Sequence, residues 1–147
     1  MTASISPMSP QDALIAVTFV TAISDDLMSE KEYREITATV NLLPVFKGYD
    51  TDRIDGIIDT VQAFMEEDDG VESLVGLVKS ALPDYLYETA YALACDVAAA
   101  DGSVAIGEMR LLEELRQGLS LDRLNAAAIE RGARARHTRL TLSLIHI

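Results

Sequence analysis

The chain has 147 residues, and 49% of them are hydrophobic, which is enough material for one domain with a substantial core. A single Cys excludes a disulfide framework and a Cys-based zinc site, and no apolar run in the sequence is long enough to span a bilayer. The first ten residues carry no Lys or Arg and no long apolar run, so we expect no secretory signal and a cytoplasmic protein.

The net charge of −12 is unevenly distributed along the chain. Residues 1–109 hold 20 acids and 5 bases, whereas residues 110–147 hold 4 acids and 7 bases. The acidic part should repel nucleic acid and attract cations or a basic partner. The Arg-rich end could meet an anionic surface, but Arg late in a helix also complements the negative end of the helix dipole, and this second interpretation is favoured.

Helical signals follow one another through the chain. Ser9, Pro10 and Asp12 predict the first helix start, with Ser as N-cap, Pro at the first helical position and Asp near the positive end. Apolar periodicity, caps and breakers predict helices over about residues 10–24, 29–43, 52–70, 74–82, 85–100, 105–118 and 123–132. Nothing reads as a strand. The sequence therefore predicts an all-α, compact bundle of about seven helices in one domain, residues 9–137.

The apolar positions of the last two predicted helices indicate which face should be buried. The expected inward residues are Met109, Leu112 and Leu115 of the sixth helix and Leu124, Ala127 and Ala128 of the seventh.

Two stretches of the chain, 76 positions apart, have nearly the same pattern. Residues 22–32 and 98–108 each contain an Asp and a Glu seven residues apart, between two apolar helical runs. The shared offset aligns Asp25 with Asp101 and Glu32 with Glu108. A duplicated helix–acidic turn–helix hairpin, with pseudo-twofold symmetry, is therefore the expected organising unit.

These residues resemble the tellurite-resistance TerB-like family of small helical bacterial proteins, in particular its alphaproteobacterial members. The second turn has the family's Ala-Asp-Gly…Glu pattern in Ala100, Asp101, Gly102 and Glu108, and the first is a weaker copy with Asp26 in place of the Gly. Further similar segments are Leu43-Pro44-Val45-Phe46, Ala81-Leu82-Pro83, Glu88-Thr89-Ala90-Tyr91-Ala92-Leu93-Ala94 and Ala126-Ala127-Ala128-Ile129-Glu130-Arg131-Gly132. The resemblance implies a pseudo-twofold helical domain without known enzymatic activity, associated with tellurite and chemical-stress operons, whose paired acids are suspected cation sites.

The acids at the two turns are the candidate metal-binding residues. They are Asp25, Asp26, Glu32, Asp101 and Glu108. If each hairpin closes tightly, its Asp and Glu could converge and hold Ca²⁺ or Mg²⁺ together with loop carbonyls and water. These turns have fewer ligands than an EF-hand loop, so we expect weak affinity, about millimolar.

A purely structural role for the same acids competes with the cation site. Glu32 is the third residue after Ser29 and could complete a capping box, and Glu108 could serve the dipole at its helix start. Asp25 and Asp101 could accept hydrogen bonds from turn amides. We therefore hold three functional hypotheses. The first is a non-enzymatic, cation-responsive stress protein, the second a metal-independent module whose acidic face docks a basic or membrane-associated protein, and the third, least favoured, an acid-pair hydrolase.

Two further features require an interpretation. The run Glu66-Glu67-Asp68-Asp69 falls at a predicted helix C-terminus, where negative charge is unfavourable; a solvated loop is favoured over a contact with a cation or basic partner. Cys95 aligns with Phe19 of the first copy, an apolar core position, which predicts a buried and inert thiol.

The last residues differ in character from the rest of the chain. Residues 142–147 are apolar and β-prone after an Arg-rich helical run, and they match an in-frame translation of a transposon-based sequencing adaptor. We therefore expect residues 138–147 to be a non-native tail, which removes His146 from the candidate ligands.

Overall fold

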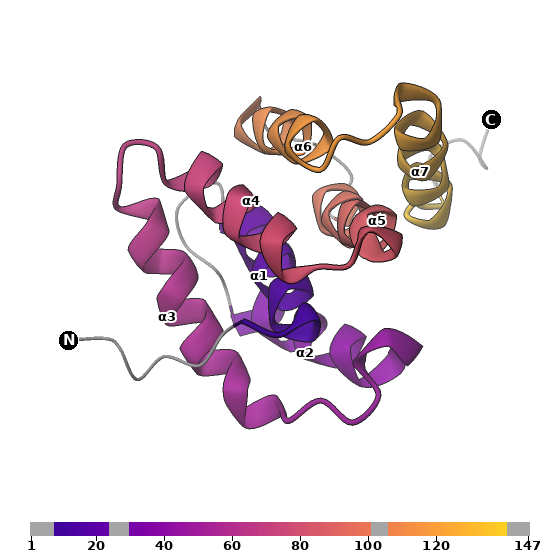
Figure 1. Cartoon of the computed structure of the whole chain (residues 1–147). Coiled ribbons are helices and arrows are strands. Elements are labelled where there is room, and N and C mark those ends of the chain that lie inside the picture. Colours follow the sequence, from indigo (N-terminus) through magenta and orange to yellow (C-terminus); the bar gives the residue numbers. More distant parts are fainter. Residues whose placement is uncertain (1–7, 24–29, 101–105, 141–147) are drawn as a thin grey trace.

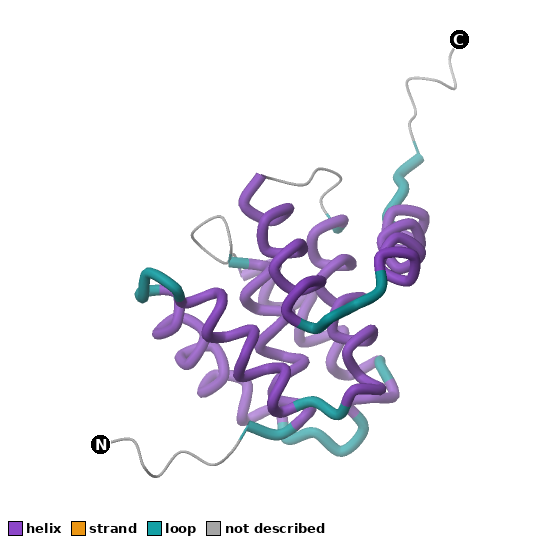
Figure 2. Tube along the Cα trace, turned by 45° about the horizontal axis from the view of Figure 1, so that its top comes forward, coloured by secondary structure: helices purple, strands orange, loops and turns teal. Residues whose placement is uncertain are grey.

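The computed structural model describes residues 8–23, 30–100 and 106–140, and for residues 106–108 only the backbone. These parts contain helices and loops and no strand, which confirms the predicted all-α class (Figure 2). The α-helices are α1 (Pro10–Ala22), α2 (Glu30–Leu42), α3 (Ile54–Met65), α4 (Gly70–Ala81), α5 (Tyr87–Ala99), α6 (Ile106–Gly118) and α7 (Arg123–Arg136). Short 3-10 turns are η1 (Pro44–Phe46), η2 (Thr51–Arg53) and η3 (Asp84–Leu86). Within the described parts, no helix has the length and apolar character needed to cross a bilayer.

Helix α1 is the centre of the bundle, with α2, α3, α4 and α5 packed around it (Figure 1). Its start is the predicted one, because Ser9 and Asp12 form a capping box and Pro10 occupies the first turn. Every residue from Asp12 to Ala22 is buried, as expected for a helix that is apolar all round. The buried hydroxyls of Thr18 and Thr21 donate to carbonyls one turn earlier, both at 2.8 Å, so neither is left unsatisfied.

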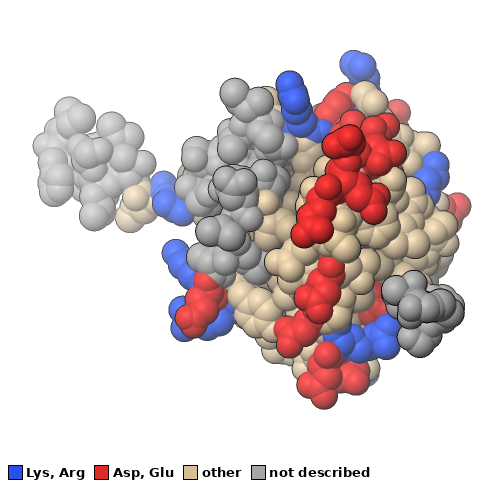
Figure 3. Space-filling model, turned by 90° about the vertical axis from the view of Figure 1, so that its left-hand side faces the viewer, with Lys and Arg blue, Asp and Glu red and all other residues tan. Residues whose placement is uncertain are grey.

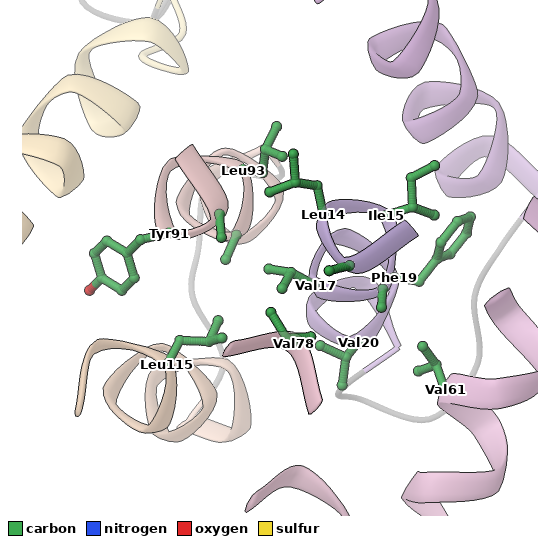
Figure 4. Packing of buried hydrophobic residues seen from close by; sticks show 14 of the residues in the cluster. Leu14, Ile15, Val17, Phe19, Val20, Val61, Val78, Tyr91, Leu93 and Leu115 are labelled. Atoms are coloured by element: carbon green, nitrogen blue, oxygen red, sulfur yellow. The ribbon is translucent and has the colours of Figure 1, made fainter. Parts of the chain in front are cut away.

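Helix α5 forms the second buried layer and joins α1 to the C-terminal helices. Leu14 and Val17 of α1 extend toward α5, where Leu93 lies, whereas Phe19 extends to the opposite side (Figure 4). The other side of α5 contacts α6 and α7. The hydrophobic core is thus one continuous cluster that runs through α1 and α5.

The expected inward faces of the last two helices are partly wrong. Met109 is 59% exposed, and Leu111 with Leu115 forms the buried face of α6, where Leu112 is only partly buried. On α7, Leu124 is 77% exposed and both Ala127 and Ala128 are exposed, while the buried positions are Ala126 and Ala133.

Polar contacts to α5 explain the rotation of α7, that is, why it buries a different face from the predicted one. Tyr91 donates to Glu130 at 2.5 Å, Asn125 donates to Glu88 at 3.2 Å, and Arg136 bonds Asp96 at 2.7 Å. These bonds turn the face with Glu130 toward α5, where the small side chains of the two buried alanines allow a close approach. Leu124 then points outward despite its apolar character.

The boundary between α3 and α4 also differs from the sequence prediction. The helix predicted to run to Gly70 ends at Met65, and Gly70 is instead the first residue of α4. A Cβ atom on Gly70 would lie 1.7 Å from the Phe64 carbonyl oxygen, so only glycine fits this tight reversal. Residues 66–69 are consequently the connection between two helices.

Candidate functional site

Most of the five predicted metal-binding side chains lie outside the described part of the chain. Asp25, Asp26 and Asp101 lie outside the described residues, and the side chain of Glu108, in the first turn of α6, does as well. Glu32 lies in the first turn of α2 and is partly buried. Among the described side chains, no three His, Cys, Asp or Glu are grouped closely enough to hold a metal ion. The cation site therefore stays a prediction.

A groove of about 750 Å³ lies beside the end of α1. Three segments distant in sequence form it: the C-terminal end of α1, the α3–α4 connection with its flanking turns, and the first half of α6. Its apolar side chains are Val20, Ile23, Met65, Val71 and Leu111. Ile23, Met65 and Val71 are only partly buried, so the groove leaves apolar surface open to solvent.

Acidic side chains surround this apolar floor. The carboxylates that line the groove are Glu66, Glu67, Asp68, Asp69, Glu72 and Glu114. Among the described lining residues, Arg110 is the one base. Figure 3, which faces the α3 side of the molecule, shows acidic side chains gathered in a band with few Lys or Arg between them. We call this hollow the acidic groove.

Local backbone structure holds the four acids of the α3–α4 connection at the rim. The amide of Glu67 donates to the Phe64 carbonyl at 3.0 Å, and that of Gly70 donates to the Glu67 carbonyl at 3.2 Å. Asp69 occupies the N-cap position of α4, but its side chain makes no capping hydrogen bond. Within the described residues, no side chain or amide bonds any of these four carboxylates, so they face solvent.

The helix dipoles explain why acidic residues are favourable at two of these four positions. The sequence placed them at the end of a helix, where the dipole disfavours them. The structure places Asp68 and Asp69 also beside the N-terminus of α4, where negative charge is favourable. The dipole of α4 does not account for Glu66 and Glu67, which follow the last turn of α3 directly.

Helices α4 and α6 pack closely at residues that do not line the acidic groove. A Cβ atom on Gly118 would lie 2.3 Å from Cγ1 of Val75, so the two helices nearly touch there. Four residues earlier on α4, Val71 lines the groove opposite Leu111 and Glu114 of α6.

A different carboxylate is wholly enclosed at the opposite end of α1. Asp12 is fully buried and accepts hydrogen bonds from Tyr49 at 2.7 Å and from Arg53 at 2.5 and 3.1 Å. The Ser9 amide adds a bond of 3.1 Å. Burial alone would raise the pKa of Asp12, but the bonds from Arg53, Ser9 and Tyr49 outweigh it and lower the pKa to about 2.

The same contacts attach the loop between α2 and α3 to the start of α1. Gln11 donates to the carbonyls of Val45 at 3.0 Å and Lys47 at 3.3 Å, next to the contacts of Asp12. The pKa of Tyr49 is raised, first by burial and then by its bond to Asp12. Arg53 keeps 42% of its side chain exposed, so its charge is shared between Asp12 and water. The sequence showed Asp12 only as a capping residue, because its partners lie 37 and 41 positions away.

The third notable polar group is the set of side chains between α5 and α7. Cys95 is buried, as predicted, and burial together with the charge of Glu130 raises its pKa to about 12. The thiol is therefore protonated at neutral pH, which makes it a poor nucleophile. Burial and the hydrogen bond to Glu130 also raise the pKa of Tyr91.

Comparisons with protein-family models, with curated proteins and with solved structures gave no match to this chain. Over the part of the chain that the structure describes, the class is an all-α bundle of seven helices with an acidic groove at the end where α1 finishes.

Proposed function

We propose that the chain is a non-enzymatic TerB-like protein that acts by binding in the response to tellurite or chemical stress. Its binding surface is the acidic groove. The observation that carries this proposal is the acidic groove, whose described lining residues include partly open apolar side chains, six carboxylates and one base. A basic partner or a cation complements such a surface, whereas nucleic acid would be repelled.

The state of the buried polar groups supports a binding role over catalysis. Asp12 and Glu130 are committed to hydrogen bonds that hold helices and loops together, and the single thiol has a raised pKa. Among the described residues, the titratable groups with large pKa shifts therefore have structural explanations, and none of them lines the acidic groove.

The proposal includes the duplicated hairpin. Helices α2 and α6 end 76 positions apart, at Leu42 and Gly118, and α1 and α5 have 13 residues each and begin 77 positions apart. Phe19 and Cys95, which the offset aligns, are both buried, and Ile36 is buried where Leu112 is partly buried. These correspondences support a pseudo-twofold relation between α1–α2 and α5–α6.

Weak Ca²⁺ or Mg²⁺ binding at Asp25, Asp26, Glu32, Asp101 and Glu108 is the second component of the proposal. It draws support from the end of α1 lining the groove up to Ile23, two residues before Asp25. An ion at these acids and a basic partner at the groove would both respond to the same excess of negative charge.

Thermal unfolding of the whole chain tests the proposed function. The melt is recorded in EDTA, then with increasing Mg²⁺ or Ca²⁺, and separately with a Lys-rich peptide, for the wild type and for Asp25→Asn/Asp101→Asn. A ligand at 100 times its dissociation constant should stabilise the chain by about 2.7 kcal/mol. Saturable stabilisation by an ion that the double variant loses supports the cation component. If neither the ions nor the peptide stabilise the chain, a binding role for the acidic groove and the turn acids is contradicted.

The stress role has its own test. Host cells that express the wild type should survive tellurite better than cells that express equal amounts of a variant with the groove acids neutralised. Equal survival, at equal protein levels, would separate the acidic groove from the stress response.

A further inference from the structure

The acidic groove combines two features that seldom favour the same ligand. Its floor exposes apolar surface from Ile23, Met65 and Val71, next to the buried Val20 and Leu111. Its rim carries six carboxylates and one base among the residues that the structure describes. A small ion would use the rim and leave the floor in water, whereas a purely apolar ligand would use the floor and leave the charges unanswered.

An amphipathic basic helix uses both features. Apolar side chains at positions i, i+3, i+4 and i+7 would enter the groove, and Lys or Arg at the flanking positions would face the rim. The volume of about 750 Å³ is suited to a few such side chains, since ligand pockets span about 300–1,000 Å³. The α3–α4 connection and the first half of α6 both line the groove, so the helix would lie between them.

The charge of the chain argues against a second copy as occupant. Each chain has a net charge of −12, so two copies repel each other. The Arg-rich end of the chain is also engaged in part within its own molecule, because Arg136 bonds Asp96 and Arg139 donates to the Ala100 carbonyl at 2.9 Å. A separate basic protein is the better complement.

We propose that the acidic groove binds a short, basic, amphipathic helix of a partner protein, with its apolar face on Met65, Val71 and Ile23 and its cationic side chains against the α3–α4 connection. This inference rests on the proposed function and names the partner class for the same surface.

Binding of a labelled peptide, followed by fluorescence anisotropy, tests the inference. The probe is a helix-forming peptide with Leu at i, i+3, i+4 and i+7 and Lys at the flanking positions. One control peptide has the same composition but spreads the Leu residues around the helix, and a second has Glu in place of Lys. Only the first peptide should bind saturably, and its affinity should fall as salt rises.

Chain variants then locate the site. Glu67→Lys/Asp68→Lys, at the rim, should weaken binding at least tenfold. Glu35→Lys/Asp84→Lys changes the net charge equally at residues that do not line the groove, and it should have less than a threefold effect. Met65→Gln, on the floor, should weaken binding of the amphipathic peptide with no change in charge. Circular dichroism shows whether each variant remains folded.

The outcomes distinguish failure of the inference from failure of the proposed function. Equal affinity for the amphipathic and the scrambled peptide, or equal loss in both charge variants, overturns the helix-in-groove inference and leaves unspecific attraction. Saturable stabilisation by Ca²⁺ or Mg²⁺ without peptide binding overturns the inference but keeps the proposed function. Absence of both overturns both. Concentration-dependent dimerisation, measured by sedimentation, that Glu67→Lys/Asp68→Lys abolishes would make a second copy the occupant and would overturn the inference.

Discussion

The two ends of α1 use carboxylates in opposite ways. At its start, Asp12 is fully buried and accepts bonds from Tyr49, Arg53 and the Ser9 amide. At its end, the acidic groove carries six carboxylates, and the four of the α3–α4 connection have no bonding partner within the described residues. A buried charge is stable only when donors surround it, so Asp12 holds its donors in place and has a structural role. The others cost the fold little and remain available to a ligand.

Removal of the buried carboxylate should give the largest effect. Asp12→Ala leaves the Arg53 charge, the Tyr49 hydroxyl and the Ser9 amide without their acceptor, and it should lower the free energy of unfolding by about 3 kcal/mol. Because Arg53 is 42% exposed and can be hydrated, the loss should lie at the lower end for broken buried pairs. Urea unfolding measures it, and Asp59→Ala, an exposed acid of α3, is the matched control with an expected loss below about 0.5 kcal/mol. Similar losses in both variants would show that the buried hydrogen bonds of Asp12 do not stabilise the fold more than an exposed acid does.

Acid should weaken the same contact without mutation. The pKa of Asp12 is about 2 in the folded chain against an ordinary 3.8, so its ionised form contributes about 2 kcal/mol above pH 4. That contribution should disappear as the pH falls from about 4 to about 2. Urea unfolding of the wild type and Asp12→Asn at pH 6 and pH 3 measures the difference in stability, which should shrink at the lower pH. A constant difference would mean that the charge of Asp12 is not the stabilising feature.

The turn that presents the acids should tolerate less change than the acids themselves. Gly70→Ala places a methyl group 1.7 Å from the Phe64 carbonyl oxygen, so the connection must move, at a cost of about 1–2 kcal/mol. Gly76→Ala, on the same helix, has nothing within 4 Å of the new Cβ and should instead stabilise by about 0.5–1 kcal/mol. The sign of the two changes in Tm, measured by thermal melts, tests the geometry. Stabilisation by Gly70→Ala would contradict the tight reversal.

The sequence correctly predicted features that depend on residues close together in the chain, such as helix caps and apolar helix faces. The capping box at Ser9 and Asp12 and the cap at Asp122 are read within three residues, and both helix starts were placed correctly. The apolar face of α3, which includes Ile54, Ile57 and Val61, follows from helical periodicity alone.

Features that depend on distant contacts could not be predicted in this way. The partners of Asp12 lie on a loop 37 and 41 residues later, and no local pattern connects them. The rotation of α7 follows from bonds to α5, which override the apolar character of Leu124. The acidic run Glu66–Asp69 was visible in the sequence, but its place beside Val20 and Leu111 requires three separate segments to meet.

Charge reversal at the rim should have the smallest effect on stability, and it provides the sharpest contrast with Asp12. Glu67→Lys removes a negative charge near the C-terminus of α3, where the dipole disfavours it, while Asp68→Lys removes one near the N-terminus of α4, where it is favoured. Each change is worth about 0.3–1 kcal/mol with opposite sign, so the double variant should stay within about 0.5 kcal/mol of the wild type. Urea unfolding measures the sum and the two single variants its parts. A loss above about 1 kcal/mol would show that these carboxylates hold the fold together, as Asp12 does, and that they are not free for a ligand.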